Sequence, residues 1–256
     1  MKVEWLIEDI DVKTVVEFVK SQINNPFVKK RIEKNVNGPI PNFNREVFWK
    51  TMVSCLLTTQ QRSGPDSTVT DFICTKPFPL NFRANKKQVK LAKFIEDTIT
   101  KFGGLRRAKT IGDEVEVNLG RLEGGVWREI ENFARVLLNN RKRKPQVSDA
   151  VTERKAAHFV IENLKGFGPK QSRNLWQALG LTRFEIPIDS RITKWLNNHN
   201  FPVRLSASGL SDSDYYNFIM DGIQKLCRAS NTYPCILDAA IFASFDKEWS
   251  EDKLVW

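Results

Sequence analysis

The sequence predicts an all-α protein of about ten helices. Apolar residues recur three and four positions apart along most of the chain, as at Val15, Phe18 and Val19. This is the spacing of one face of a helix. Long alternation of β-branched and polar residues is absent, and no Asn-Gly turn joins two candidate strands, so a sheet is at most a minor element. There is also no internal repeat or low-complexity tract.

The helical pattern can be followed element by element. Asp9 or Asp11 can cap the first helix, over residues 11–23, because acidic residues favour a helix start. The next two helices are predicted over 44–61 and 86–102, from the apolar positions Val47, Phe48, Met52, Leu56 and Leu57, then Val89, Leu91, Ala92, Ile95 and Ile99. The same periodicity predicts further helices over 107–119, 126–138, 151–164, 170–179, 190–197, 212–229 and 234–249.

Composition limits the class of protein. The 256 residues can form one large or two modest domains. Apolar residues make up 41% and charged residues 27%, as in ordinary globular proteins. With 40 Lys and Arg against 30 Asp and Glu, the formal net charge of +10 favours a polyanionic partner. No long apolar run or signal-peptide pattern occurs, so we expect a soluble intracellular protein without a membrane partner.

The sequence lacks the usual metal-binding patterns. The cysteines are widely spread without a C-x-x-C pair, and His158 and His199 have no ligand spacing. We therefore expect buried free thiols and no metal held by side chains. The four cysteines are Cys55, Cys74, Cys227 and Cys235. No P-loop occurs either.

A basic run over residues 141–144, Arg-Lys-Arg-Lys, precedes Pro145. It is interpreted as an exposed, solvated connection. Direct contact of this run with DNA is the alternative.

The most informative segment is 164–178, LKGFGPKQSRNLWQA. It is typical of a helix end, a turn with Gly166 and Gly168, and a second helix entered through Pro169. Glycines allow close approach to the backbone, and proline suits the first helical position. Such a turn at a helix N-terminus favours binding of a phosphate. Lys170 lies at the positive end of the second helix, where a cation is mildly unfavourable, which marks it as a functional candidate.

Asp189 follows in the segment Ile186-Pro187-Ile188-Asp189-Ser190-Arg191. The residue before a proline is biased towards extended structure. Asp189 or Ser190 can then cap the helix that follows. Capping is the simplest role for Asp189 when this segment is considered alone.

Together these motifs resemble the helix-hairpin-helix DNA glycosylases, specifically the 8-oxoguanine glycosylase branch. The resemblance rests on Leu164-x-Gly166-x-Gly168-x-Lys170 and on Asp189, nineteen positions after the lysine. Weaker support comes from residues 56–61, LLTTQQ, and 239–242, AAIF. The similarity spans roughly residues 50–245.

The resemblance implies two helical domains with a DNA-binding cleft between them. One would comprise residues 46–180 with the hairpin, and the other residues 1–45 and 181–256. It also implies that Lys170 is the nucleophile and Asp189 its electrostatic and proton-handling partner. A carboxylate suits this chemistry, because breaking an N-glycosidic bond places positive charge on the sugar.

The resemblance also implies contacts with DNA. Gly166 and Gly168 would offer backbone N–H groups to a phosphate, and a monovalent cation could lie on backbone carbonyls near Leu164. Residues 56–61 are similar to the family's helix end, which bears a Gln that fills the gap in the opened duplex, so Gln60, Gln61 and the adjacent Arg62 are assigned to DNA binding. The roles of Arg62, Arg106 and Arg107 stay open between contact with the orphaned base and contact with phosphates.

Base recognition is assigned to Asp238, Phe242 and Asn174. The 8-oxoguanine branch usually has Gln four residues before the stacking Phe, and this chain has Asp238 there. An ionised Asp can accept from the N1–H and N2–H₂ groups of a guanine. It can also accept from the amino group of a cytosine. A surface Asp beside a core Phe is the structural alternative.

The leading hypothesis is therefore a base-excision repair glycosylase with AP lyase activity, which removes an oxidised guanine from double-stranded DNA. Alternatives are a glycosylase for a modified cytosine or alkylated purine, and a non-catalytic DNA-binding protein. No cofactor is required. We expect a DNA-associated monomer in the cytoplasm, nucleoid or nucleus.

Overall fold

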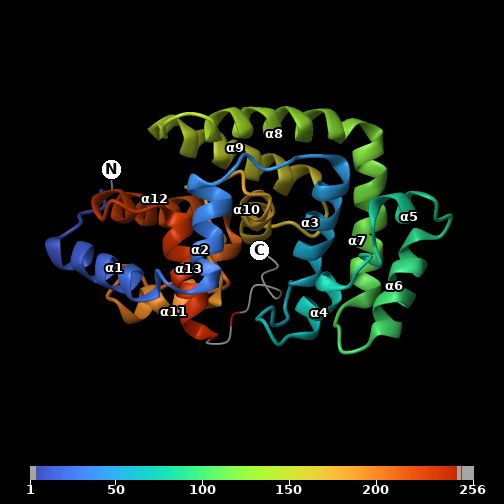
Figure 1. Cartoon of the computed structure of the whole chain (residues 1–256), viewed down its shortest axis with the longest axis horizontal. Coiled ribbons are helices and arrows are strands. Elements are labelled where there is room, and N and C mark those ends of the chain that lie inside the picture. The colour runs from blue at the N-terminus through green and yellow to red at the C-terminus, as the bar shows by residue number, and fades with distance from the viewer. Residues whose placement is uncertain (1–3, 247–248, 250–256) are drawn as a thin grey trace.

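The computed structural model describes residues 4–246 and 249 and is mainly helical (Figure 1). No strand occurs among the described residues, so the predicted all-α class is confirmed. The α-helices are α1 (Asp9–Gln22), α2 (Pro26–Ile32), α3 (Arg45–Leu57), α4 (Thr68–Cys74), α5 (Phe82–Lys86), α6 (Leu91–Phe102), α7 (Ala108–Arg121), α8 (Trp127–Arg141), α9 (Val147–Asn163), α10 (Pro169–Ala178), α11 (Ser190–Asn198), α12 (Ser213–Ala229) and α13 (Pro234–Phe245). Two short π-helices, η1 (Glu33–Asn37) and η2 (Leu122–Val126), and one 3₁₀ turn, η3 (Gly209–Ser211), are also present.

The buried apolar side chains form two clusters. The larger cluster consists mainly of side chains from α3–α10, and its Trp49 and Trp176 are fully buried. The smaller is built mainly from α11, α12 and α13, with Tyr216 at 0% exposure. In Figure 1, α1, α2 and α11–α13 lie on one side, α3–α7 on the other, and α10 near the middle. This arrangement places α10 beside the chain segment that leads into α11.

The predicted domain boundaries do not coincide with these clusters. Phe27 of α2 and Ala239 of α13 belong to the larger cluster, although both lie in the ranges assigned to the second domain. α2 and α13 pack against each other. The division at residues 45 and 180 stays a prediction.

Three short helices were missed in the sequence because none shows a long apolar repeat. Each begins at a polar cap whose side chain accepts a backbone N–H: Asn25 for α2, Ser67 for α4 and Asn81 for α5. In α2 the cap is followed by Pro26, a combination that favours a helix start. The missed helices therefore had a local signal in their caps.

The helix predicted over 44–61 is too long at its end. α3 ends at Leu57, where the hydroxyls of Thr58 and Thr59 both donate to the Cys55 carbonyl. Gln60 then adopts a left-handed backbone conformation, with φ of 59°. This geometry stops the helix and directs the next residues along a different path.

Other boundaries also differ from the predictions. α6 begins at Leu91 rather than 86, and α9 begins at Val147 rather than 151. The earlier start of α9 follows from a reciprocal cap between Gln146 and Asp149. α13 is described to Phe245, and residues 247–248 of its predicted range lie outside the described residues.

The interpretation of the basic run as an exposed connection is wrong for its first residue. Arg141 is 6% exposed and belongs to α8. Its guanidinium donates to the carbonyl oxygens of Gly180, Val36 and Lys34 at 3.2, 2.6 and 3.2 Å. Residues 142–144 are exposed as predicted. Arg141 thus joins the segment before α3 to the end of α10.

We expect Arg141→Ala to lower the free energy of unfolding by about 2–3 kcal/mol, because it leaves buried carbonyl groups without a donor. The exposed neighbour provides a control with the same charge change, and Lys142→Ala should alter stability by less than about 0.5 kcal/mol. Urea denaturation of both variants would measure the difference. Equal stability of the two would contradict the structural role of Arg141.

No helix among the described residues is long and apolar enough to span a membrane.

Candidate active site

The hairpin predicted from the glycines lies between α9 and α10. Gly166 has φ of +85°, a conformation that L side chains rarely adopt. A Cβ at this position would lie 2.7 Å from Glu114 Cδ and 2.7 Å from Leu56 Cδ2. Gly168 is the N-cap of α10 and has open space around it. The first glycine is needed by the turn, whereas the second leaves backbone accessible from outside.

Two side chains of α7 hold this turn. Asn118 brackets Lys165, accepting from its N–H at 2.7 Å and donating to its carbonyl at 3.0 Å. Glu114, packed against Gly166, accepts from the Arg107 guanidinium at 2.9 Å. Burial raises the pKa of Glu114, opposed by the Arg107 charge. The role of Arg107 left open by the sequence is therefore, in this structure, an ion pair beneath the hairpin.

The glycines make a matched pair for mutagenesis. Gly166→Ala should destabilise the fold by about 2–3 kcal/mol, from backbone strain and close contact. Gly168→Ala should change stability by less than about 1 kcal/mol, since its backbone suits alanine. Thermal denaturation would test this order. If a phosphate approaches the Gly168 N–H, Gly168→Ala should nevertheless weaken DNA binding, and unchanged DNA affinity would contradict that contact.

Asp189 is the N-cap of α11. Its Oδ1 accepts from the N–H groups of Arg191 and Ile192 at 2.8 and 3.1 Å. The preceding strand-like segment is fixed by Tyr216, whose hydroxyl donates to the Ile186 carbonyl at 2.9 Å and accepts from the Ile188 N–H at 2.5 Å. The capping role expected for Asp189 is present, and it fixes the carboxylate in space.

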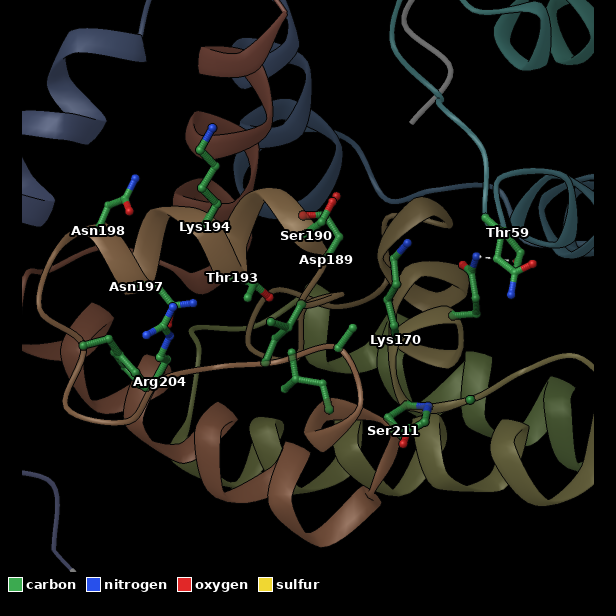
Figure 2. A pocket seen from close by; sticks show the side chains of 18 of the residues that line it. Thr59, Lys170, Asp189, Ser190, Thr193, Lys194, Asn197, Asn198, Arg204 and Ser211 are labelled. Atoms are coloured by element: carbon green, nitrogen blue, oxygen red, sulfur yellow. Dashed lines mark hydrogen bonds between the residues drawn. The ribbon is translucent and has the colours of Figure 1, made fainter.

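Lys170 and Asp189 face the same cleft. Both line a cavity of about 1280 Å³ and an adjoining cavity of about 780 Å³. Figure 2 shows the Lys170 side chain extending from α10 next to Asp189. The Lys170 side chain forms no ion pair or hydrogen bond with the described residues. The hairpin lysine and the carboxylate nineteen positions later therefore line the same open site, and the amine has no ion-pair partner among the described residues.

Gln60, Gln61 and Arg62 form the loop after α3, and their side chains differ in surroundings. Gln60 is exposed and lines both cavities. Gln61 is turned inward, where it accepts from the Arg106 N–H at 2.9 Å and donates to the Leu57 carbonyl. Arg62 pairs with Asp246 at 3.0 Å. Gln61 and Arg62 line the smaller cavity only, and the assignment of all three residues to DNA binding stays a prediction.

A polar network connects this loop to α10. Gln171, next to Lys170, donates to the hydroxyls of Thr59 at 2.8 Å and Thr58 at 3.3 Å. Asn174, one turn further, donates to Gln171 at 3.1 Å and contacts Cys55 Sγ at 3.5 Å. Asn174 therefore supports the network rather than lining either cavity. Its assignment to a base pocket stays a prediction.

Asp238 is buried at 5% exposure between α10 and α2. It accepts from Gln177 Nε2 at 2.6 Å and lies 3.8 Å from Arg31 Nη1. Burial raises the pKa of Asp238 to about 6, the Arg31 charge opposes the rise, and the charge of Asp189 adds to it. Asp238 is thus electrostatically coupled to the site, although it does not line either cavity.

Phe242 is half-buried in an aromatic group. It stacks on Phe27 with centroids 4.9 Å apart and lies 5.3 Å from Trp249. The Arg191 guanidinium lies over its ring at 4.0 Å. A base that stacked on this face of the ring would have to displace Arg191, so the stacking role of Phe242 stays a prediction.

Arg191 and Asp246 were not predicted as site residues. Arg191 contacts Asp189 Oδ2 and Asp246 Oδ2, each at 3.2 Å. Asp246 also contacts Arg62 and packs against Gly64. This chain of ion pairs joins the loop after α3 to α11. Arg191 was present in the motif, but Asp246 gave no signal in the sequence.

The cysteines and histidines form no metal site: no suitable group of His, Cys, Asp and Glu occurs in residues 4–246 or at 249. Burial raises the pKa of the thiols of Cys55, Cys227 and Cys235. Cys74 is half-buried, unlike the burial expected for it. The carbonyl cation site near Leu164 stays a prediction.

Comparison with solved structures finds three similar chains. The 8-oxoguanine DNA glycosylase of Methanocaldococcus jannaschii has a TM-score of 0.64 at 16% identity, covering 93% of this chain and 94% of that one. Its complex with a 15mer DNA containing 8-oxoguanine gives 0.62 at 15% identity, with 90% and 96% covered. The 8-oxoguanine DNA glycosylase of Thermotoga maritima gives 0.58 at 13% identity, with 93% and 98% covered.

These TM-scores and coverages show a shared fold, and the fold expected from the hairpin and its aspartate is confirmed. No family sequence model matches the chain, and no curated protein sequence matches it significantly.

Proposed function

We propose that this protein is a DNA glycosylase with AP lyase activity that removes an oxidised guanine of the 8-oxoguanine type. The observation that carries the proposal is that Lys170 and Asp189 line one open cleft beside the glycine hairpin. The fold shared with three structures of two 8-oxoguanine glycosylases supports it. Double-stranded DNA with a damaged base is the proposed partner, bound by a monomer, and the reaction needs no cofactor.

The chemistry follows from the two side chains. Departure of the base breaks the bond between C1′ and the base nitrogen and leaves positive charge on the sugar, which the Asp189 carboxylate stabilises. The neutral Lys170 amine attacks C1′ and gives up a proton, which the departing base takes up. The C1′–O4′ bond then breaks, O4′ takes a proton from water to become a hydroxyl, and the protonated imine left between C1′ and Lys170 is a Schiff base. Loss of a C2′ proton then expels the 3′ phosphate by β-elimination. The DNA strand is cut and the lysine is regenerated by hydrolysis.

The preference for a guanine rests on Asp238. With a pKa of about 6, its carboxyl is mainly ionised at neutral pH and accepts hydrogen bonds. The N1–H and N2–H₂ groups of an everted guanine derivative are matching donors. Because Asp238 is held by Gln177 and Arg31, base binding requires the surrounding side chains to open. A modified cytosine would offer its amino group to the same acceptor and is the second candidate substrate.

A panel of single-lesion duplexes tests the proposal. Each duplex carries 8-oxoguanine, a modified cytosine, an alkylated purine or undamaged guanine at one position. We expect base release and strand cleavage with 8-oxoguanine, and a covalent complex when borohydride is added. Preferred release of the modified cytosine would support the proposed reaction and show that its substrate is a cytosine derivative instead of an oxidised guanine. Salt-sensitive DNA binding without base release from any duplex would contradict the proposed glycosylase activity and indicate a non-catalytic DNA-binding protein.

A further inference from the structure

The larger cavity extends well beyond Lys170 and Asp189. From the hairpin it follows α11 to the loop before η3 (Figure 2), where Thr59 and Arg204 lie at opposite ends. We call its far part the distal groove, defined by Lys194, Asn197, Asn198, Asn200 and Arg204. None of these residues is used by the chemistry proposed above.

One face of α11 forms the wall of this groove. The polar side chains on this face recur at three- and four-residue intervals and are Ser190, Thr193, Lys194, Asn197 and Asn198. The opposite face is buried in the smaller apolar cluster through Ile192, Trp195 and Leu196. A helix with this division has a fixed orientation. The polar face therefore continues directly from the Asp189 cap.

The loop that carries Arg204 is rigidly attached to α11. Asn197 donates to the Leu205 carbonyl at 3.1 Å and accepts from the Leu205 N–H at 2.8 Å. Leu205 itself is buried at 4% exposure. Asn200 adopts φ of 56°, and the following Phe201 N–H donates to the Leu196 carbonyl at 3.1 Å. The folded loop thus holds Arg204 beside the helix.

The charge of the cavity is strongly one-sided. Among the described residues that line it, Lys170, Lys194 and Arg204 are cations and Asp189 is the one carboxylate. Within the described part of the chain, Arg204 has no hydrogen bond or ion pair, and Lys194 contacts the Phe245 ring at 5.5 Å. Both side chains are exposed. Two exposed cations that line one groove and have no carboxylate partner among the described residues are suited to a ligand with regularly spaced negative charges.

We propose that the distal groove holds the phosphates of the lesion-bearing strand on one flank of the everted nucleotide, with Lys194 and Arg204 each neutralising one phosphate. The proposal rests on the proposed function, since it takes Lys170 and Asp189 as the place of the everted nucleotide. From Asp189 to Asn198, α11 rises about 13 Å. With one phosphate per about 3.4 Å of axis along a strand, the groove spans about four nucleotide steps.

The test is the salt dependence of binding to a duplex with a stable abasic analogue. The double variant Lys194→Ala/Arg204→Ala loses two phosphate contacts. The negative slope of log K against log salt should therefore become shallower by about 1.8. The control Lys87→Ala/Lys90→Ala removes the same charge from exposed residues between α5 and α6 and should leave the slope unchanged. Equal slopes for the two double variants would overturn the proposal.

A second measurement locates the contact. In duplexes that end about two base pairs from the lesion on one flank, the difference between wild type and Lys194→Ala/Arg204→Ala should disappear for one flank and persist for the other. Persistence with both truncations would overturn the proposal. Because the binding assay uses an abasic analogue, absence of base release by the wild type would refute the proposed function without altering this result.

Discussion

Lys170→Gln is expected to abolish the covalent complex that borohydride traps with lesion-containing DNA. The variant has no amine to attack C1′, so no Schiff base forms. Base release should fall by about 10³-fold or more, as for loss of a nucleophile in other enzymes. Gel electrophoresis after borohydride reduction measures the first effect and single-turnover kinetics the second. DNA affinity should change little, because Lys170 is one of several cations at the cleft.

Lys165→Gln is the matched control. Lys165 lies in the same hairpin and is exposed, and its attachment to Asn118 uses backbone atoms. The substitution removes the same charge and leaves these bonds intact, so trapping and base release should persist. A trapped complex with Lys170→Gln would exclude Lys170 as the nucleophile.

Asp189→Asn should reduce turnover by about 10²–10³-fold, because it removes the negative charge that stabilises the developing positive charge of the sugar. The fold should remain intact. Asparagine caps helices about as well as aspartate, so the change in unfolding free energy should be below about 0.5 kcal/mol. Turnover and thermal denaturation measured on one preparation separate the two effects. DNA binding should be largely retained.

Asp212→Asn makes the identical change at another helix cap. Asp212 begins α12 and accepts from the Tyr215 N–H at 2.8 Å, but it does not line the cleft. Its substitution should leave both turnover and stability unchanged. If Asp189→Asn retains full turnover, Asp189 is a structural cap and the reaction proposed above loses its carboxylate.

The long helices and the hairpin could be predicted because their signals are local. Apolar spacing marks α12 from end to end, and Gly166, Pro169 and Asp189 each impose a conformation on their own backbone. The short helix α4 could not be predicted from periodicity, since its seven residues complete less than two full repeats. Its Ser67 cap was the available signal.

The surroundings of the site residues were not predictable, because they depend on partners distant in the sequence. Arg141 lies in a charged run of the sequence that was predicted to be exposed, yet three carbonyl groups from two other segments surround it. Asp238 was placed at a base pocket by its spacing from Phe242, but its contacts with Gln177 and Arg31 arise from packing of α13 against α10 and α2. Tertiary contacts of this kind have no periodic signature in a single sequence.

The cap of α11 ties reactivity to folding. Because Oδ1 of Asp189 is held by two backbone N–H groups, the carboxylate acquires its orientation when the helix forms, and in the proposed reaction little rotational freedom is left to lose when substrate binds. Preorganisation of this kind also makes the reaction sensitive from a distance. A substitution that weakens packing on the buried side of α11 would change the orientation of the Asp189 carboxylate, although the substituted residue does not line the cleft. We expect such a variant to have a slower chemical step and unchanged substrate affinity.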